Sequence, residues 1–99
     1  MKIFIVQPMN GKSDEMIMHE RTQVKQHILE KYPYAEFVES FIMDDAPADS
    51  MPPLFYLGES IKCLAKADTI YLCDNWDKAR GCRIEYQCAK EYGLDTLLI

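Results

Sequence analysis

The sequence predicts a single α/β domain in which helices cover both faces of a four-stranded parallel sheet. Apolar, strand-like segments alternate with segments of helical period in the order β-α-β-α-β-α-β. The first apolar run, residues 2–7, is nearly continuous, which is typical of a strand buried on both faces. Alternation of this kind with right-handed crossovers gives the strand order 2-1-3-4. A chain of 99 residues has room for one domain, residues 1–99.

Each element follows from a local signal. The first strand, residues 2–7, ends at a loop with Pro and Gly, and Ser13 is a good N-cap for a helix that runs to about Lys31. The expected later elements are a strand at 36–41, a helix from Leu54 to just before Ala67, a strand at 69–73, a helix from about Gly81 to Tyr92, and a strand at 95–99. The polar stretch 42–53 is either a solvated connection or a binding loop.

Composition excludes several classes of function. A net charge of −5 without a Lys/Arg cluster argues against binding a nucleic-acid polymer, although a single nucleotide remains possible. No apolar run approaches the roughly 20 residues that span a membrane, and the first residues lack the features of a signal peptide. We therefore expect no membrane association and a cytoplasmic protein. The cysteines and histidines lack metal-site spacing, so neither a metal nor another cofactor is expected.

The four cysteines have two possible roles. Cys63, Cys73 and Cys88 fall at apolar positions, where cysteine acts as a small buried hydrophobic residue. Cys82 lies at the expected start of a helix, where a thiol can have a lowered pKa and act as a nucleophile.

Glu85 faces the apolar side of the last helix. With about 100° per residue, Ile84, Cys88 and Tyr92 are expected to form an apolar stripe, and Glu85 falls on the same side in the first helical turn. Burying a charge is costly, and a helix N-terminus compensates only in part. Glu85 is therefore either a structural partner of the helix dipole or of a buried ion pair, or a catalytic or binding group.

Arg21 is a second anomaly of the same kind. It lies in the middle of the apolar stripe formed by Ile17, Val24 and Ile28 on the first helix. Either its side chain extends out of the core edge to solvent, or it pairs with a buried carboxylate or contacts a ligand.

The expected topology directs attention to one edge of the sheet. In such folds ligands bind beyond the carboxyl ends of the strands where the strand order reverses, here between the first and third strands. The loops at that edge are 8–12, 42–53 and 74–81, so Glu85 is expected to face Asn10 and Gly11 across the crevice. No complete phosphate-binding fingerprint is present, but a Gly-containing loop that leads into a helix can hold an anion.

Three segments in order resemble the nucleoside 2-deoxyribosyltransferase superfamily, which includes N-glycosidases that hydrolyse deoxynucleoside monophosphates. They are residues 3–11, 64–72 and 80–89, followed by Gly93. The similarity is greatest to short bacterial and phage-borne members with a Q-P-M-x-G start and a W-x-x-A-R-G-C-x-x-E segment. Order and spacing agree over nearly the whole chain.

The resemblance implies a flavodoxin-like (Rossmann-like) three-layer sandwich and a glutamate nucleophile, which falls on Glu85. It also implies a homodimer or higher homo-oligomer. The loop that lies by the sugar or its 5′-phosphate falls on Met9, Asn10 and Gly11. Ser60 stands where several relatives have an acid.

The predicted function is cleavage or transfer of a nucleoside or nucleotide N-glycosidic bond. Glu85 would attack C1′ as the base departs, and Asp74, Asp77, Asp44 or Asp45 would protonate the base. Trp76 and Tyr71 either stack a base or belong to the core or its rim. Arg80 would bind a phosphate or fix Glu85. The expected substrate-binding residues are Gln7, Met9, Asn10, Gly11, Arg21, Asp44, Asp45, Ser60, Trp76, Arg80 and Gly81.

Two alternatives remain open. The domain binds or senses a nucleotide without cleaving it, and Ser60 in place of an acid favours this view. Or it is an interaction module that uses a semi-apolar helix side formed by Tyr56, Ser60 and Cys63.

Overall fold

The structure, a computed structural model, describes residues 1–40 and 45–99. In these residues four strands form one parallel sheet in the order β2-β1-β3-β4, which confirms the predicted fold class and strand order. The elements are β1 (Lys2–Val6), α1 (Asp14–Lys31), β2 (Glu36–Phe37), α2 (Pro52–Leu64), β3 (Thr69–Leu72), the 3₁₀ helix η1 (Trp76–Lys78), α3 (Arg80–Glu91) and β4 (Asp95–Thr96).

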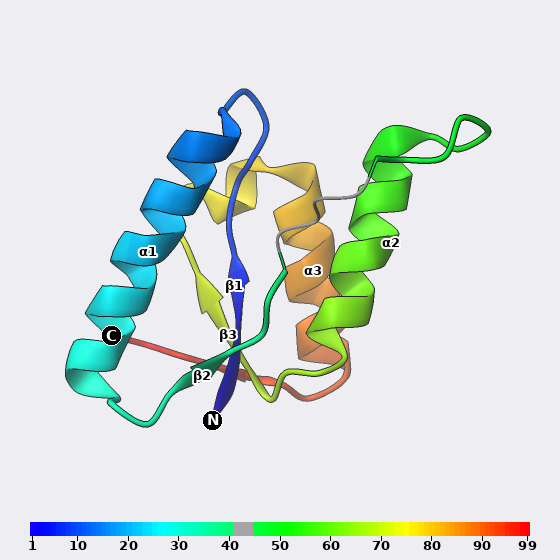
Figure 1. The fold of residues 1–99 in the computed structure, drawn as a ribbon. Helices are drawn as coiled ribbons and strands as arrows, with labels where there is room; N and C mark the ends of the chain where they lie inside the picture. The colour runs from blue at the N-terminus through cyan, green and yellow to red at the C-terminus, as the bar shows by residue number, and fades with distance from the viewer. Residues whose placement is uncertain (41–44) are drawn as a thin grey trace.

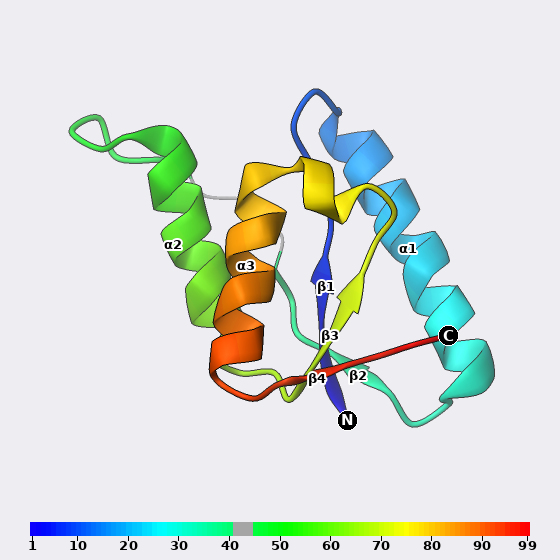
Figure 2. The ribbon, with the colours of Figure 1, turned by 180° about the vertical axis from the view of Figure 1, so that it is seen from behind.

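The sheet separates the helices into two layers. Helix α1 lies on one face, and α2 and α3 lie side by side on the other, as the two opposite views in Figures 1 and 2 show. The loops that follow β1 and β3 emerge at one edge of the sheet, together with the start of α2 (Figure 1). The three-layer arrangement thus gathers the carboxyl ends of the strands at one edge, which is the place where the sequence predicts a site.

Strand β1 is the centre of both cores. Ile3 and Ile5 join Ile28 of α1 in one apolar cluster. Phe4 and Val6 join the second cluster, against α2 and α3. Successive side chains of a strand point to opposite faces, so a strand between two helical layers needs apolar residues at every position. This explains why the first strand is an unbroken apolar run.

Helix α1 begins at a side-chain cap. The hydroxyl oxygen of Ser13 accepts a hydrogen bond from the backbone N–H of Met16 at 3.2 Å. We expect Ser13→Ala to lower the free energy of unfolding by about 1 kcal/mol, because this N–H loses its partner. Urea unfolding monitored by circular dichroism would measure the change. Thr22→Ala is the matched control, since it removes an exposed hydroxyl from the same helix without touching a cap; an equal loss there would contradict the capping role.

The outer strands are shorter than predicted. The expected strand 36–41 is reduced to Glu36–Phe37, although the N–H of Val38 still donates to the carbonyl of Ile3 at 2.9 Å; position 41 lies outside the described residues. The expected strand 95–99 is reduced to Asp95–Thr96. Both lie at an edge of the sheet, where pairing on one side only lets a strand end early. The apolar pattern of the sequence therefore indicates which residues are buried, but it does not predict how many of them pair with the neighbouring strand.

Smaller differences concern the ends of other elements. Strands β1 and β3 each end one residue before the predicted boundary. Helix α2 starts at Pro52, two residues before the predicted start, because proline is accommodated in the first helical turn, where the N–H has no partner. In the described part of the chain, no helix has the length and apolar character that crossing a membrane requires.

Candidate active site

Helix α3 buries a different stripe from the one predicted. The buried side chains are Cys82, Glu85 and Ala89, whereas Ile84 is 38 % exposed and Tyr92 is 85 % exposed. The predicted apolar stripe through Ile84 and Tyr92 is therefore wrong, but the predicted inward orientation of Glu85 is confirmed. The helix turns its small residues to the sheet, because Cys82 and Ala89 allow it to pack closely.

Glu85 lies in the second turn of α3 and not in the first, because the helix begins at Arg80. The favourable field of a helix N-terminus falls off within the first turn, so the dipole offers Glu85 little compensation. Only 9 % of the residue is exposed. Burial raises the pKa of the Glu85 carboxyl to about 7, although a hydrogen bond with the Ser60 side chain and the charge of Arg21 act in the opposite direction. Glu85 therefore changes its protonation state near neutral pH.

Arg21 is the largest fully buried side chain, with 1 % exposed. The expectation that it extends to solvent is therefore wrong. Its Nε donates to Oε1 of Gln7 at 3.1 Å, and its Nη1 donates to the hydroxyl of Ser40 at 2.7 Å. Nη1 also lies 3.8 Å from a carboxylate oxygen of Glu39. Burial lowers the pKa of the guanidinium, and Glu39 and Glu85 oppose that effect.

Gln7 holds Arg21 from the end of β1. Its Nε2 donates to the carbonyl of Ile17 at 2.9 Å, while its Oε1 accepts the bond from Arg21. Each end of the amide thus has a defined partner, which fixes its orientation. Nearby, Lys12 forms a salt bridge of 2.9 Å with Glu20. Gln7, Arg21 and Ser40 join β1, α1 and the segment after β2 in one buried polar network.

A hollow of about 280 Å³ occupies the switch point on the α1 side of the sheet. It lies between the carboxyl ends of β1 and β3, as the topology predicts. Its lining includes Gln7, Pro8, Lys12, Tyr71, Cys73 and Asp74. Glu85 is not part of the lining; it approaches the sheet from the opposite face, on α3. Gln7 is common to the hollow and to the Arg21 network, so it connects the two regions.

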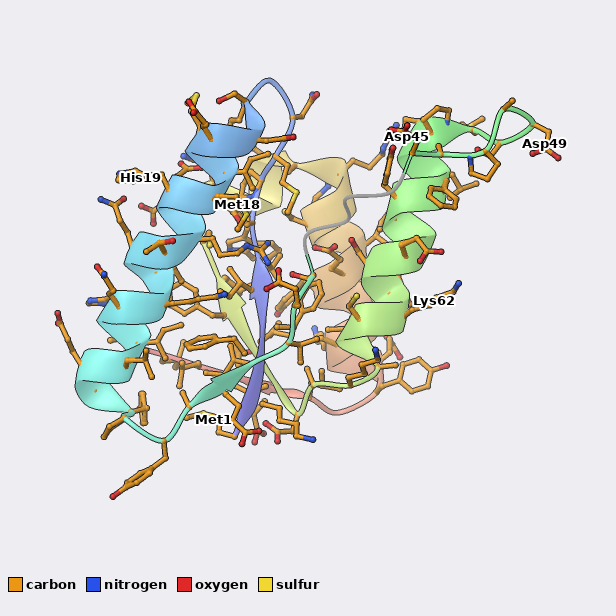
Figure 3. The ribbon with its side chains drawn as sticks, viewed as in Figure 1. Met1, Met18, His19, Asp45, Asp49 and Lys62 are labelled. Atoms are coloured by element: carbon orange, nitrogen blue, oxygen red, sulfur yellow. The ribbon has the colours of Figure 1, made fainter. Side chains whose placement is uncertain are left out.

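The predicted proton donors are dispersed. Asp74 is exposed and lines the hollow. Asp77 is exposed, and its backbone carbonyl accepts a hydrogen bond from Arg83 at 3.1 Å. Asp45 is exposed at the start of the loop before α2, away from the strands (Figure 3). Asp44 lies outside the described residues.

The remaining predicted binding residues lie around the same edge. Trp76 packs its ring 4.7 Å from that of Tyr86 and against the core on the α2 and α3 side, an arrangement that favours the core role. Ser60 on α2 contacts Glu85. Among the other residues expected to bind substrate, Met9 and Gly81 are half-buried, whereas Asn10, Gly11 and Arg80 are exposed.

The thiols near the site are not nucleophiles at neutral pH. Burial raises the pKa of Cys82 to about 12 and that of Cys73 to about 11. The thiolate is the reactive form of cysteine, so the alternative in which Cys82 acts as a nucleophile is contradicted. No cluster of three or more potential metal-ligating side chains occurs in residues 1–40 and 45–99.

Two residues of the polar network were not predicted. Ser40 and Glu39 follow β2, at the end of a segment that the sequence presents as a strand. A serine in such a segment carries no signal of its own, because its partner comes from a helix 19 residues earlier in the chain. The inward position of Arg21 was the available signal that some polar partner had to exist.

The family described as a domain of unknown function, DUF4406, matches residues 1–98. Neither the curated proteins nor the solved structures contain a match to the chain. Because the match covers almost the entire sequence, the chain belongs to the DUF4406 family.

Proposed function

We propose that this domain cleaves or transfers the N-glycosidic bond of a deoxynucleoside or its 5′-monophosphate, with Glu85 as the nucleophile. The observation that carries the proposal is a buried carboxyl with a pKa of about 7, located next to a carboxyl-end sheet edge. Strongly shifted carboxyls in such positions are typical of catalytic groups. The resemblance of residues 3–11, 64–72 and 80–89 to nucleoside 2-deoxyribosyltransferases supports the assignment of this particular chemistry.

The reaction proceeds by two displacements at C1′. A carboxylate oxygen of Glu85 bonds to C1′ as the C1′–N bond breaks, and the bonding electrons leave with the base, which takes up a proton. The resulting sugar ester is attacked by water, which gives hydrolysis, or by a second base, which gives transfer. Of the described carboxyls expected to supply the proton, Asp74 lines the hollow at the switch point. The chemistry requires no cofactor.

The ionisation of Glu85 sets the pH dependence of the reaction. Only the carboxylate attacks, so kcat/KM is expected to rise with pH through a midpoint near 7 and to fall again at the pH where the group that protonates the leaving base loses its proton. A pH–rate profile between about pH 5 and 9, recorded with substrate well below KM, would show this midpoint. A rise completed near pH 5 would contradict a nucleophile with a raised pKa.

The activity is tested with a panel of deoxynucleosides and their 5′-monophosphates, with and without a second free base. Chromatography follows released or exchanged base. Exchange identifies a transferase, and release alone identifies a hydrolase. Absence of both from every member of the panel contradicts the proposed chemistry.

The hollow favours one alternative function, the binding or sensing of a nucleotide without cleavage. It occupies the switch point, where α/β folds bind nucleotides, and presents the ring of Tyr71 together with Lys12. Thermal stabilisation by nucleotides, without turnover of any of them, would support this alternative.

Two further parts of the proposal concern the oligomeric state and the cellular location of the protein. We propose a homodimer or higher homo-oligomer, supported by the exposed apolar residues Met51 and Leu54 at the start of α2, which are 67 % and 62 % exposed. Sedimentation velocity would measure the oligomeric state. We also propose a cytoplasmic location, which fits four free cysteines in a reducing compartment.

A further inference from the structure

The hollow between the carboxyl ends of β1 and β3 takes no part in the proposed attack on C1′. The described residues that line it do not include Glu85, which approaches the sheet from the opposite face. Its volume is about 280 Å³. Pockets for drug-sized ligands measure roughly 300–1,000 Å³. The hollow is therefore sized for a smaller ligand, such as one planar ring system.

The wall and the floor of the hollow offer polar groups that are free to bind a ligand. Gln23 and His27 line it from α1, and their spacing of four residues places them on the same face of the helix. Tyr71 lines it from β3 with an aromatic ring. The side chains of Gln23, His27, Tyr71 and Asp74 form no hydrogen bond with the described part of the chain.

These groups can both donate and accept hydrogen bonds. An amide and an imidazole each offer a donor and an acceptor, and the carboxylate of Asp74 accepts. Burial raises the pKa of the Tyr71 phenol, and Cys73 and Asp74 act in the same direction, so the hydroxyl keeps its proton and can donate. A flat ring with donors and acceptors along its edge matches this set, because the ring can lie against Tyr71 while its edge meets the polar groups.

The charges of the lining disfavour an anionic ligand. Lys12 is the cation of the lining, and its Nζ donates to both carboxylate oxygens of Glu20, at 2.9 and 3.1 Å. Asp74 adds a second carboxylate, so with histidine counted as neutral the described lining carries one net negative charge. A phosphate would have to displace Glu20 from Lys12 and would still lie near Asp74.

We propose that the hollow binds a free, uncharged nucleobase, apart from the reaction centre at Glu85, and that the ion pair of Lys12 and Glu20 disfavours ligands that carry a phosphate. The choice of a nucleobase among flat polar rings rests on the proposed function, since cleavage of an N-glycosidic bond releases such a base. A base in the hollow is not at the attacking carboxylate. The site therefore retains or senses the released base.

Two histidines on one helix make the test specific. His27 lines the hollow, whereas His19, labelled in Figure 3, lies on α1 outside the described lining. The full chain is titrated by NMR with adenine, hypoxanthine, cytosine or thymine at a fixed pH, because histidine signals also move with pH. With at least one base, the imidazole signal of His27, assigned with His27→Ala, is expected to move to saturation while that of His19 stays. Absence of a saturable change at His27 with every base overturns the proposal.

A pair of glutamine variants tests whether the side chains of the hollow make the contact. Gln23→Ala is expected to weaken binding of the base about threefold to tenfold, which is the effect of one net hydrogen bond. Gln26→Ala is the matched control, since it removes an exposed glutamine of the same helix outside the described lining, and the affinity is expected to stay. Both changes replace exposed helical residues by alanine, so the fold is retained. Equal affinities in the two variants overturn the proposal.

The exclusion of phosphate is tested in the Glu85→Gln protein, so that turnover does not consume the ligand. The deoxynucleoside 5′-monophosphate of the responsive base is expected to bind at His27 about fivefold or more weakly than the free base. Glu20→Gln releases Lys12 and is expected to narrow this difference. A monophosphate that binds at His27 as tightly as the base overturns the proposal and favours the nucleotide-sensing alternative.

The binding experiments are independent of turnover. Binding of a base at His27 in a protein without glycosyl activity retains the site and rejects the proposed function. Glycosyl activity in a protein whose His27 responds to no base retains the proposed function and rejects the site.

Discussion

Glu85→Gln is expected to reduce turnover of the responsive deoxynucleoside or monophosphate by at least roughly 1,000-fold, because the amide cannot form the sugar ester. The variant keeps the size and shape of the side chain, so packing against α2 is retained. Initial rates from chromatography of the released base would measure the loss. Glu91→Gln is the matched control: it neutralises an exposed carboxyl at the other end of α3 and is expected to leave the rate within about twofold of the wild type. A rate in Glu85→Gln close to that of the control would reject Glu85 as nucleophile.

The same substitution is expected to stabilise the protein at alkaline pH. The folded-state pKa of Glu85 is about 7, against 4.5 for an unperturbed glutamate. In the wild type, the favourable contribution of the protonated carboxyl is fully present below about pH 4.5 and is lost as the pH rises through 7. At pH 8.5 this loss amounts to about 3 kcal/mol, since each pKa unit corresponds to about 1.4 kcal/mol. Glu85→Gln avoids it.

Urea unfolding at pH 4 and at pH 8.5 would separate this effect from a general change in packing. The difference between the variant and the wild type is expected to grow from near zero at the lower pH to about 3 kcal/mol at the higher one. Glu91→Gln should change the free energy of unfolding by less than about 0.5 kcal/mol at both. A constant difference at the two pH values would show that burial does not hold the proton on Glu85.

Taken together, the two expected results have opposite signs for the same side chain. If replacing Glu85 stabilises the protein but abolishes turnover, its role is in the reaction and not in the fold. If Glu85 is a structural carboxylate, replacing it destabilises the protein and leaves the reaction intact. The pair of measurements thus decides between the two interpretations of Glu85 that the sequence leaves open.

The architecture was predictable because it depends on patterns that are local in the chain. The unbroken apolar run in residues 2–7 indicates a strand between two layers, and alternation with helices fixes the topology. The inward position of Arg21 was also predictable, since it lies among Ile17, Val24 and Ile28 at helical spacing. The inward position of Glu85 was predicted through Ile84 and Tyr92, which are exposed, so the prediction was right for Glu85 and wrong for the stripe that supported it. Periodicity finds such residues because it reads only which side of an element a residue occupies.

What surrounds these two residues was not predictable. Ser40 forms a hydrogen bond with Arg21, which lies 19 residues earlier in the chain. The charges of Arg21 and Glu85 influence each other although the two residues belong to helices on opposite faces of the sheet. The place of Glu85 along α3 was also misjudged: it is the sixth residue of a helix that begins at Arg80, and it lies in the second turn, where the helix dipole compensates little. Contacts of this kind depend on how far each element extends and how it is rotated, and neither is encoded in a periodic pattern.

The shortness of the outer strands bears on how the molecule opens. Strands β1 and β3 pair over four positions, whereas β2 and β4 are each held by two. Local unfolding takes the least free energy where the ladder is shortest, so fluctuations should begin at the margins of the sheet and leave its middle closed. Ser40 follows β2, one of these margins, while Gln7 follows β1 at the centre. The guanidinium of Arg21 is thus hydrogen-bonded on one side to Gln7, in the part of the sheet that opens last, and on the other to Ser40, in a part that opens early. Local opening at β2 is therefore expected to break the bond to Ser40 while the bond to Gln7 remains.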